Sequence, residues 1–149
     1  MSSAHPSSQF ETLLALRSLQ TQLEHAALAE ETRRLEAVET DLGQAELELN
    51  DAQEQWKAYV NRSTLAPEQL QAYAQHLIAT DARRNQARDK HEFQKDTLAV
   101  QRTRVFQAQA HEDVAEHLLE HNRVQVKKKK ERLIEDARDE RVGLDWGRS

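Results

Sequence analysis

Helix-ending residues are almost absent from this chain of 149 residues. Proline occurs only at Pro6 and Pro67, and of the three glycines only Gly43 lies ahead of the last seven residues. The stretches 8–62 and 67–142 are instead dense in Ala, Leu, Glu, Gln, Lys and Arg. Because proline and glycine are the residues that interrupt helices, almost nothing in either stretch ends a helix for dozens of residues. We therefore predict two very long helices.

Local signals indicate where these helices begin and how they are joined. The segment Ser8-Gln-Phe-Glu11 matches a capping box at the start of the first helix. Pro67 suits the first position of the second helix, and Leu65 with Leu70 has the spacing of a hydrophobic staple. A short turn makes the two helices antiparallel, so the predicted fold class is all-α, a long two-helix coiled-coil hairpin with the second helix longer. The predicted organisation is a disordered start at 1–7, a single hairpin at 8–142 with helices at about 8–62 and 67–142 and a turn at 63–66, and a flexible tail at 143–149.

Apolar residues recur in steps of three and four along both stretches, as heptad a and d positions do. In the first stretch they are Leu35, Val38, Leu42, Ala45, Leu49, Ala52, Trp56 and Tyr59. In the second they are Leu70, Tyr73, Leu77, Ala87, Leu98, Val105, Ala108, Ala115, Leu119, Val126 and Leu133. Folding about the turn pairs Trp56 with Tyr73 and Leu49 with Thr80, each time an a position with a d position. The two patterns thus agree on one register.

The composition suits such a seam better than a compact core. Hydrophobic residues make up only 38% of the chain, which is low for a compact core of this length. High charge would also fit a disordered chain, but the periodic leucines argue against disorder. Leu16, Leu19 and Leu23 follow a different heptad phase, so we expect the register to slip near 26–34.

Two ends of the hairpin are candidate partner-binding sites. In the predicted register residues 121–142 extend beyond the first helix, and their apolar side chains would then lack an intramolecular partner, which usually marks an interaction site. The candidates at this end are Val126, Lys127, Lys128, Lys129, Lys130, Arg132, Leu133 and Ile134. The candidates at the turn end are Trp56, Tyr59, Leu65, Leu70 and Tyr73, of which the aromatic residues would equally serve as seam core.

Signals of chemistry are missing from the sequence. The chain has no cysteine, no glycine-rich phosphate loop and no nucleophile elbow. His117 and His121 lie one helical turn apart and could share a metal, but solvated histidines on a helix face are the simpler interpretation. Because a catalytic site needs convergent groups in a sheltered pocket, we expect no enzymatic activity, no cofactor and no metal.

Charge and hydropathy narrow the kinds of partner. Residues 1–62 carry eleven acidic and five basic side chains, which argues against nucleic acid as a partner of the whole hairpin. Lys127–Lys130 could be a solvated helix face, or could contact nucleic acid, anionic lipid or an acidic protein; among these partners we favour a protein, because acidic residues follow closely. No apolar run approaches the roughly 20 residues that span a bilayer, and the polar start at 1–8 does not resemble a secretory signal, so a cytoplasmic protein is expected.

With these features the chain resembles the small stalk proteins of type III secretion, the FliJ/YscO family (also called SctO, or HrpO in plant pathogens). The similarity covers nearly the whole length: a short polar start, an antiparallel hairpin with a longer second helix, and the mixed-charge end Lys127–Glu140. It implies a bacterial protein in the cytoplasm, peripheral to the inner-membrane secretion apparatus. The helical ends would enter the central hole of the hexameric export ATPase, and the turn would face the cytoplasmic ring of the export gate. Family members also contact secretion chaperones.

Other interpretations fit the same residues. A coiled-coil adaptor or escort would bind secretion chaperones along the hairpin without entering an ATPase ring. A nucleic-acid or membrane-surface binder would act through Lys127–Lys130. The chain could also be a monomer or a domain-swapped dimer opened at 61–67, since the same seam contacts form either way.

Overall fold

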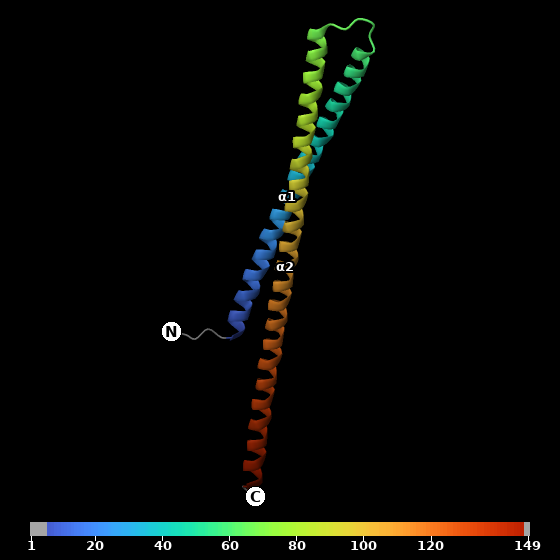
Figure 1. Cartoon of the computed structure of the whole chain (residues 1–149). Coiled ribbons are helices and arrows are strands. Elements are labelled where there is room, and N and C mark those ends of the chain that lie inside the picture. Colours follow the sequence, from blue (N-terminus) through green and yellow to red (C-terminus); the bar gives the residue numbers. More distant parts are fainter. Residues whose placement is uncertain (1–5, 148–149) are drawn as a thin grey trace, which may run out of the picture. The chain divides into compact units, whose positions relative to one another are not determined.

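Two α-helices make up nearly all of the residues that the structure describes. The structure is a computed structural model and describes residues 6–147 (Figure 1). Helix α1 runs from Pro6 to Val60 and helix α2 from Pro67 to Gly147, and residues 61–66 connect them. The second helix has 81 residues and the first has 55. The predicted all-α fold, with a longer second helix, is confirmed.

The helix bounds differ from the predicted ones: α1 begins before residue 8 and ends at Val60 instead of 62, so the connection starts at 61 and not at 63, and α2 extends beyond 142. α1 already includes Pro6, a residue favoured in the first helical turn, and the Ser8 carbonyl accepts a bond of 2.9 Å from Thr12 Oγ1 inside the helix. Ser8 is therefore not the helix cap that we predicted. α2 continues through Gly143 to Gly147 instead of ending at 142, because a glycine costs a helix only about 1 kcal/mol relative to alanine. The rest of the predicted disordered start and flexible tail, 1–5 and 148–149, lies outside the described residues.

Contacts divide the chain into two units, and each unit contains a segment of both helices. The loop unit comprises residues 25–104 and includes the connection between the helices. The terminal unit comprises 1–24 and 105–149, of which 6–24 and 105–147 are described.

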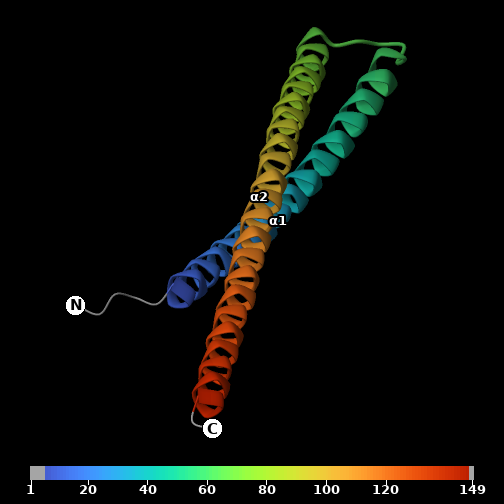
Figure 2. The same cartoon turned by 90° about the horizontal axis from the view of Figure 1, so that it is seen from below.

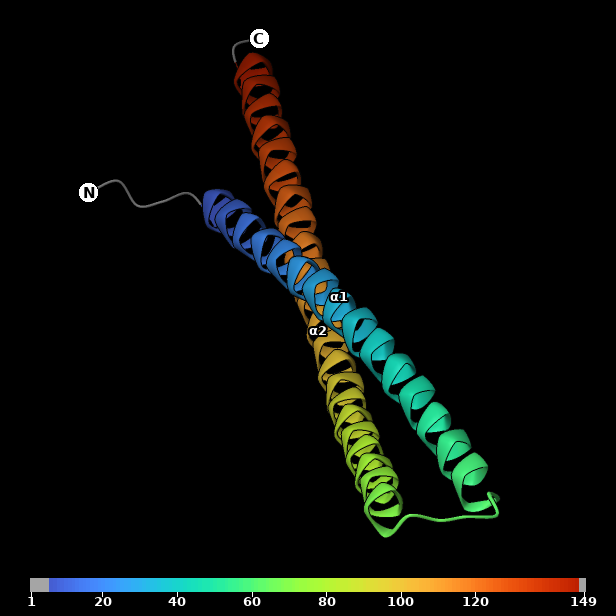
Figure 3. The same ribbon diagram turned by 90° about the horizontal axis from the view of Figure 1, so that it is seen from above.

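In the loop unit α1 and α2 run antiparallel, and the connection at 61–66 joins their neighbouring ends (Figure 2 and Figure 3). The buried residues follow the predicted three–four spacing and are Ala45, Leu49, Ala52, Tyr59, Thr80, Ala87, Gln94, Leu98 and Gln101. Leu35, Val38, Leu42, Trp56, Leu70, Tyr73 and Leu77 are half-buried on the same lines. The predicted seam of this unit is therefore confirmed.

Polar contacts across the loop unit fix how the helices align. Gln94 Nε2 donates to the Glu31 carbonyl at 3.2 Å, and His91 Nε2 lies 3.6 Å from a Glu39 carboxylate oxygen. Arg83 makes an ion pair with Glu48. The residue numbers on α2 increase from 83 to 94 while those of their partners on α1 decrease from 48 to 31, as expected for antiparallel helices.

In the terminal unit the seam is built from small and polar residues as well as apolar ones. Thr21, Val105, Ala115 and Leu119 are buried, and the Thr21 hydroxyl donates to the Arg17 carbonyl at 3.0 Å. Arg123 of α2 lies 3.9 Å from Glu11 of α1. These residues place the start of α1 beside residues 105–126 of α2.

The predicted register slip of α1 is wrong. Half-buried and buried positions keep their three–four spacing through Leu35, Glu31, Leu28, Glu24 and Thr21 without interruption. Leu16, Leu19 and Leu23 fall instead on the outside of the helix and are at least half exposed. The small hydroxyl side chain of Thr21 fills the seam here, so the apolar residues of this stretch are not the ones that pack against α2.

Candidate functional site

The start of α1 meets α2 further along than the sequence register indicated. Ser7 of α1 borders a shallow cavity of about 350 Å³ together with Val126, Lys127 and Lys130 of α2. From residue 127 to residue 147 every position of α2 is exposed. Within the terminal unit, the last part of α2 extends past the start of α1 (Figure 1). This projecting segment therefore begins near residue 127, not at 121 as we expected.

Val126 differs from the prediction for this end. It is half-buried and borders two cavities that also involve Ser7, so it does not lack an intramolecular neighbour. The reason is the register, which places Ser7 of α1 beside Val126 instead of leaving this position beyond the start of α1. Leu133 and Ile134, by contrast, are 69% and 57% exposed. Leu133 and Ile134 therefore keep the exposed apolar surface that we predicted.

Positive charge is concentrated where α1 begins. Residues 127–132 carry five basic side chains and one acidic side chain. Four consecutive lysines, about 100° apart around a helix, surround it and do not form one face. Lys127, Lys128, Lys129, Lys130 and Arg132 are all exposed. The arrangement is a basic collar around α2, and the projecting segment continues beyond it.

The apolar residues that follow Gly143 were not among the predicted candidates. Leu144 and Trp146 are 67% and 79% exposed on α2, which we had expected to end before them. Leu133, Ala137 and Leu144 are spaced by four and seven, so they share one side of the helix over about 17 Å. This spacing could have predicted that the helix continues past Gly143, but we had taken Gly143 as the residue that ends the helix.

At the turn end, Tyr59 is a core residue that fixes the connection. Its side chain is buried, and its ring stacks on Tyr73 with centroids 4.7 Å apart and planes at 30°. Its hydroxyl donates to the Ala66 carbonyl at 3.0 Å and accepts from the Ala66 amide at 2.8 Å. The Arg62 guanidinium lies 5.4 Å from the ring centroid. Tyr59 therefore presents no surface to a partner, contrary to its place among the candidates.

The other candidates at the turn end differ in exposure. Trp56, Leu70 and Tyr73 are half-buried, whereas Leu65 is 48% exposed. Tyr73 was predicted to pair with Trp56, but its ring stacks on Tyr59, three residues further along α1. Leu65 is therefore the member of this set that a partner reaches most readily.

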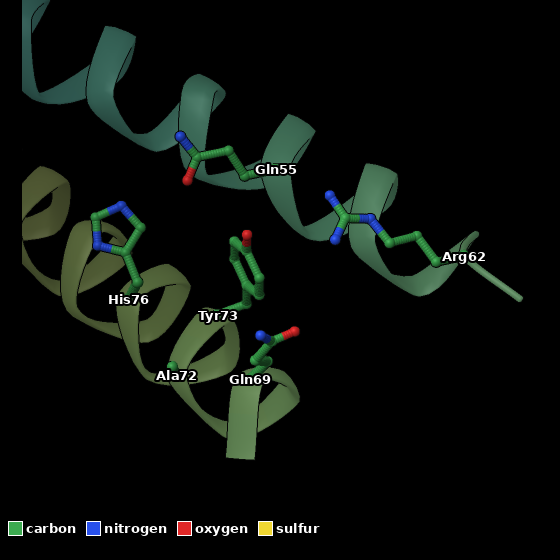
Figure 4. Close-up of a pocket in the computed structure, with 6 residues that line it drawn as sticks. All are labelled: Gln55, Arg62, Gln69, Ala72, Tyr73 and His76. Carbon is green, nitrogen blue, oxygen red and sulfur yellow. The ribbon is translucent and has the colours of Figure 1, made fainter. Parts of the chain in front are cut away.

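An open cavity of about 410 Å³ lies beside Tyr73 (Figure 4). Gln55 and Arg62 approach it from the α1 side, and residues of α2 line the rest. The lining residues are Gln55, Arg62, Gln69, Ala72, Tyr73 and His76. Amide, guanidinium and imidazole groups thus surround one aromatic ring at this cavity.

Two kinds of site are absent from residues 6–147. No group of three or more His, Asp or Glu side chains there is placed to hold a metal ion. No helix in this part of the chain is long and apolar enough to cross a bilayer.

Comparisons with models of known protein families, with characterised proteins and with solved structures find no match to this chain.

Proposed function

We propose that the chain is a cytoplasmic stalk component of a bacterial type III secretion system, which inserts its helical ends into the hexameric export ATPase and links that ATPase to the export gate. The proposal rests on the similarity to the FliJ/YscO family given by the sequence. The observation that carries it is the unequal length of the helices. α2 continues past the start of α1 as an exposed segment at 127–147, with Leu133 and Ile134 uncovered.

The projecting segment has the properties that an ATPase ring would need to hold. A single helix is about 10–12 Å across with its side chains, which is narrow enough to enter the central hole of a ring. Leu133, Ala137 and Leu144 offer an apolar line, and the basic collar at 127–132 offers charge at its base. Charged groups steer and orient an encounter, while buried apolar side chains supply most of the affinity. In this mechanism Leu133 and Ile134 anchor the segment inside the ring.

The turn end is proposed to contact the cytoplasmic ring of the export gate. Leu65 is exposed there, and the cavity beside Tyr73 lies on the same part of the loop unit. Tyr59 holds residue 66 in place through both of its backbone groups, so the surface around Leu65 is preorganised. A preorganised contact surface loses less entropy on binding than a mobile loop does.

Capture of the ATPase tests the proposal. Full-length protein, a truncation to residues 1–130 and the double variant Leu133→Asp/Ile134→Asp are each used to pull down a purified hexameric export ATPase of a type III secretion system. The truncation and the double variant should recover far less ATPase, because both remove the exposed apolar anchor. Leu47→Asp is the matched control, since Leu47 is 66% exposed on α1 and belongs to the loop unit, whereas the projecting segment belongs to the terminal unit. Equal recovery by all four proteins would refute the role of the segment.

A second candidate function, a coiled-coil adaptor that binds secretion chaperones without entering a ring, is favoured by one observation. Phe93 and Val100 are 72% and 55% exposed on α2 of the loop unit and border a cavity of about 390 Å³. Chaperone binding that survives the truncation to residues 1–130 but is lost in Phe93→Ser would support the adaptor. If both variants still bind the chaperone, the result would count against binding of an adaptor through Phe93.

A further inference from the structure

The first turns of α1 pack less closely on α2 than the next part of the terminal unit does. From Ser7 to Gln20 no residue of α1 is buried, and the inward positions, among them Phe10 and Leu14, are half-buried. Thr21 is the first buried residue along the described part of α1. Within this unit the two helices diverge toward the start of α1 (Figure 1 and Figure 3). Few buried contacts are the mark of a segment that opens locally at a low free energy.

Cavities border the same stretch of α1. Ser7 borders two, of about 310 and 350 Å³, and Glu11, Leu14 and Ser18 border a third of about 430 Å³. The ion pair between Glu11 and Arg123 spans 3.9 Å, and both side chains are more than half exposed, so it contributes little. Neither close packing nor this ion pair therefore holds the start of α1 firmly on α2.

A buried polar group of α2 lies in this part of the seam. Asn122 comes three residues after the buried Leu119 and borders one of the cavities at Ser7. Its Nδ2 atom is enclosed and donates no hydrogen bond within residues 6–147. A buried donor without an acceptor costs the free energy of its desolvation, which is recovered when the group meets water. Closing α1 over Asn122 therefore carries a penalty that opening removes.

Charge at the start of α1 acts in the same direction. The N-terminal end of a helix carries a partial positive charge, and the first turn of α1 has no acidic residue to balance it. Ser7, in that turn, borders a cavity together with Lys127 and Lys130 of α2. Like charges thus meet where α1 begins, and their repulsion favours separation of the two helices.

The residues that α1 covers here belong to the same side of α2 as the apolar line of the projecting segment. Leu119, Asn122 and Val126 follow the three–four spacing, and Leu133 comes seven residues after Val126. At 100° per residue, these four positions lie within about 60° around the helix. Leu133 is exposed, whereas Leu119 is buried. α1 therefore covers the first part of a line whose second part is open.

We propose that residues 7–14 of α1 separate from α2 in a local opening, while Thr21 and the loop unit keep their packing. The opening uncovers Leu119, Asn122 and Val126, and so extends the exposed line of the projecting segment back along α2. The start of α1 is thus an intramolecular cover, which competes with a partner that binds this line beyond Leu133. The opening itself needs no partner, so it does not depend on the proposed function.

Alkylation of single cysteines in the full chain tests the proposal. The sequence has no cysteine, so Leu119→Cys and Leu49→Cys each introduce one thiol. Both leucines are 5% exposed in the seam, and Leu49 belongs to the loop unit, which makes it the matched control. The thiol at position 119 should react with iodoacetamide at least about tenfold faster than the thiol at position 49, because the local opening exposes it. Fraying of the first turn alone would not expose position 119, since Leu119 lies beside Leu14.

Replacement of Asn122 tests the cause of the opening. Asn122→Leu removes the unpaired donor from the seam, so the thiol at position 119 should react about fivefold more slowly or less, while the rate at position 49 stays the same. Asn85→Leu, which changes an exposed asparagine of the loop unit, should alter neither rate. Circular dichroism of each variant checks that its helices form.

Hydrogen exchange of the unaltered chain gives a measurement that no substitution affects. Relative to their intrinsic rates, the amides at 10–14 should exchange at least about tenfold faster than those at 45–52, where Ala45, Leu49 and Ala52 are buried. Equal protection of the two stretches would overturn the proposal. Equal reaction rates of the two thiols, or a rate at position 119 that Asn122→Leu leaves unchanged, would overturn it as well.

Discussion

Replacing Tyr59 with phenylalanine removes one atom that makes two hydrogen bonds to the connection between the helices. The hydroxyl donates to the Ala66 carbonyl at 3.0 Å and accepts from the Ala66 amide at 2.8 Å. Phenylalanine keeps the buried ring and its stack on Tyr73. Tyr59→Phe therefore isolates the two bonds from the packing.

The expected loss of stability follows from these contacts. A net hydrogen bond contributes about 0.5–1.5 kcal/mol, so two contribute about 1–3 kcal/mol. Ala66 is exposed, and water can replace the lost hydroxyl at its backbone groups, so we expect a value in the lower half, about 1–2 kcal/mol. With a urea slope near 2 kcal/mol/M, the midpoint of unfolding should fall by about 0.5–1 M.

Urea unfolding followed by circular dichroism measures this shift. Tyr73→Phe is the matched control, because it keeps the stacked rings and both bonds to Ala66, and its free energy of unfolding should change by less than about 0.5 kcal/mol. Tyr59→Ala should cost about 3–5 kcal/mol, since it also removes the ring. Equal midpoints for Tyr59→Phe and Tyr73→Phe would refute the claim that the Tyr59 hydroxyl fixes the connection.

Three further changes test the seam and the helices. Gly43→Ala should raise the free energy of unfolding by about 0.5–1 kcal/mol, because the residue lies inside α1 and an added Cβ meets no atom within 4 Å; a lower thermal midpoint would contradict this. Arg83→Ala should cost less than about 1 kcal/mol and less still in high salt, since Arg83 and its carboxylate partners Asp41 and Glu48 are all partly exposed to water; a large, salt-independent loss would be inconsistent with a surface pair. Gln94→Ala should cost about 1–2 kcal/mol by chemical denaturation, because it leaves the polar groups of Glu31 without their cross-helix donor; an unchanged midpoint would show that this contact does not contribute.

The fold was predictable because one simple pattern determines most of it. In the first stretch, every apolar residue of the predicted heptad pattern is buried or half-buried. The same holds for the second stretch up to Val126. The connection was predictable from Pro67, which begins α2 as expected. Long helices with few breakers leave little choice of topology, so composition and period were sufficient here.

The errors came from treating apolar residues as inward by default. Leu16, Leu19 and Leu23 suggested a slip, yet α1 keeps its phase and packs with Thr21 instead. A heptad search gives weight to leucine, and it gives none to the small hydroxyl side chain that fits a close seam. These three leucines are therefore exposed, although the sequence pattern alone had suggested that they pack in the seam.

The exposure of the candidate residues was predicted in part. The exposure of Leu133 and Ile134 and the basic residues at 127–132 followed from the longer second helix, as expected. Val126 was misplaced because α1 meets α2 about four residues further along than the predicted register, which places Ser7 beside it. Tyr59 was misplaced because a backbone contact to Ala66 leaves no trace in an apolar pattern.

The central claim is that the projecting end of α2 lies inside the export ATPase while the turn faces the export gate. Site-specific photo-cross-linking in secreting cells tests it most directly, with a photoreactive residue in place of Ile134, Leu65 or Leu47. The account predicts a cross-link to the ATPase from position 134, a cross-link to the gate ring from position 65, and neither from position 47. Cross-links to a chaperone alone, or an ATPase cross-link that arises equally from position 47, would contradict it.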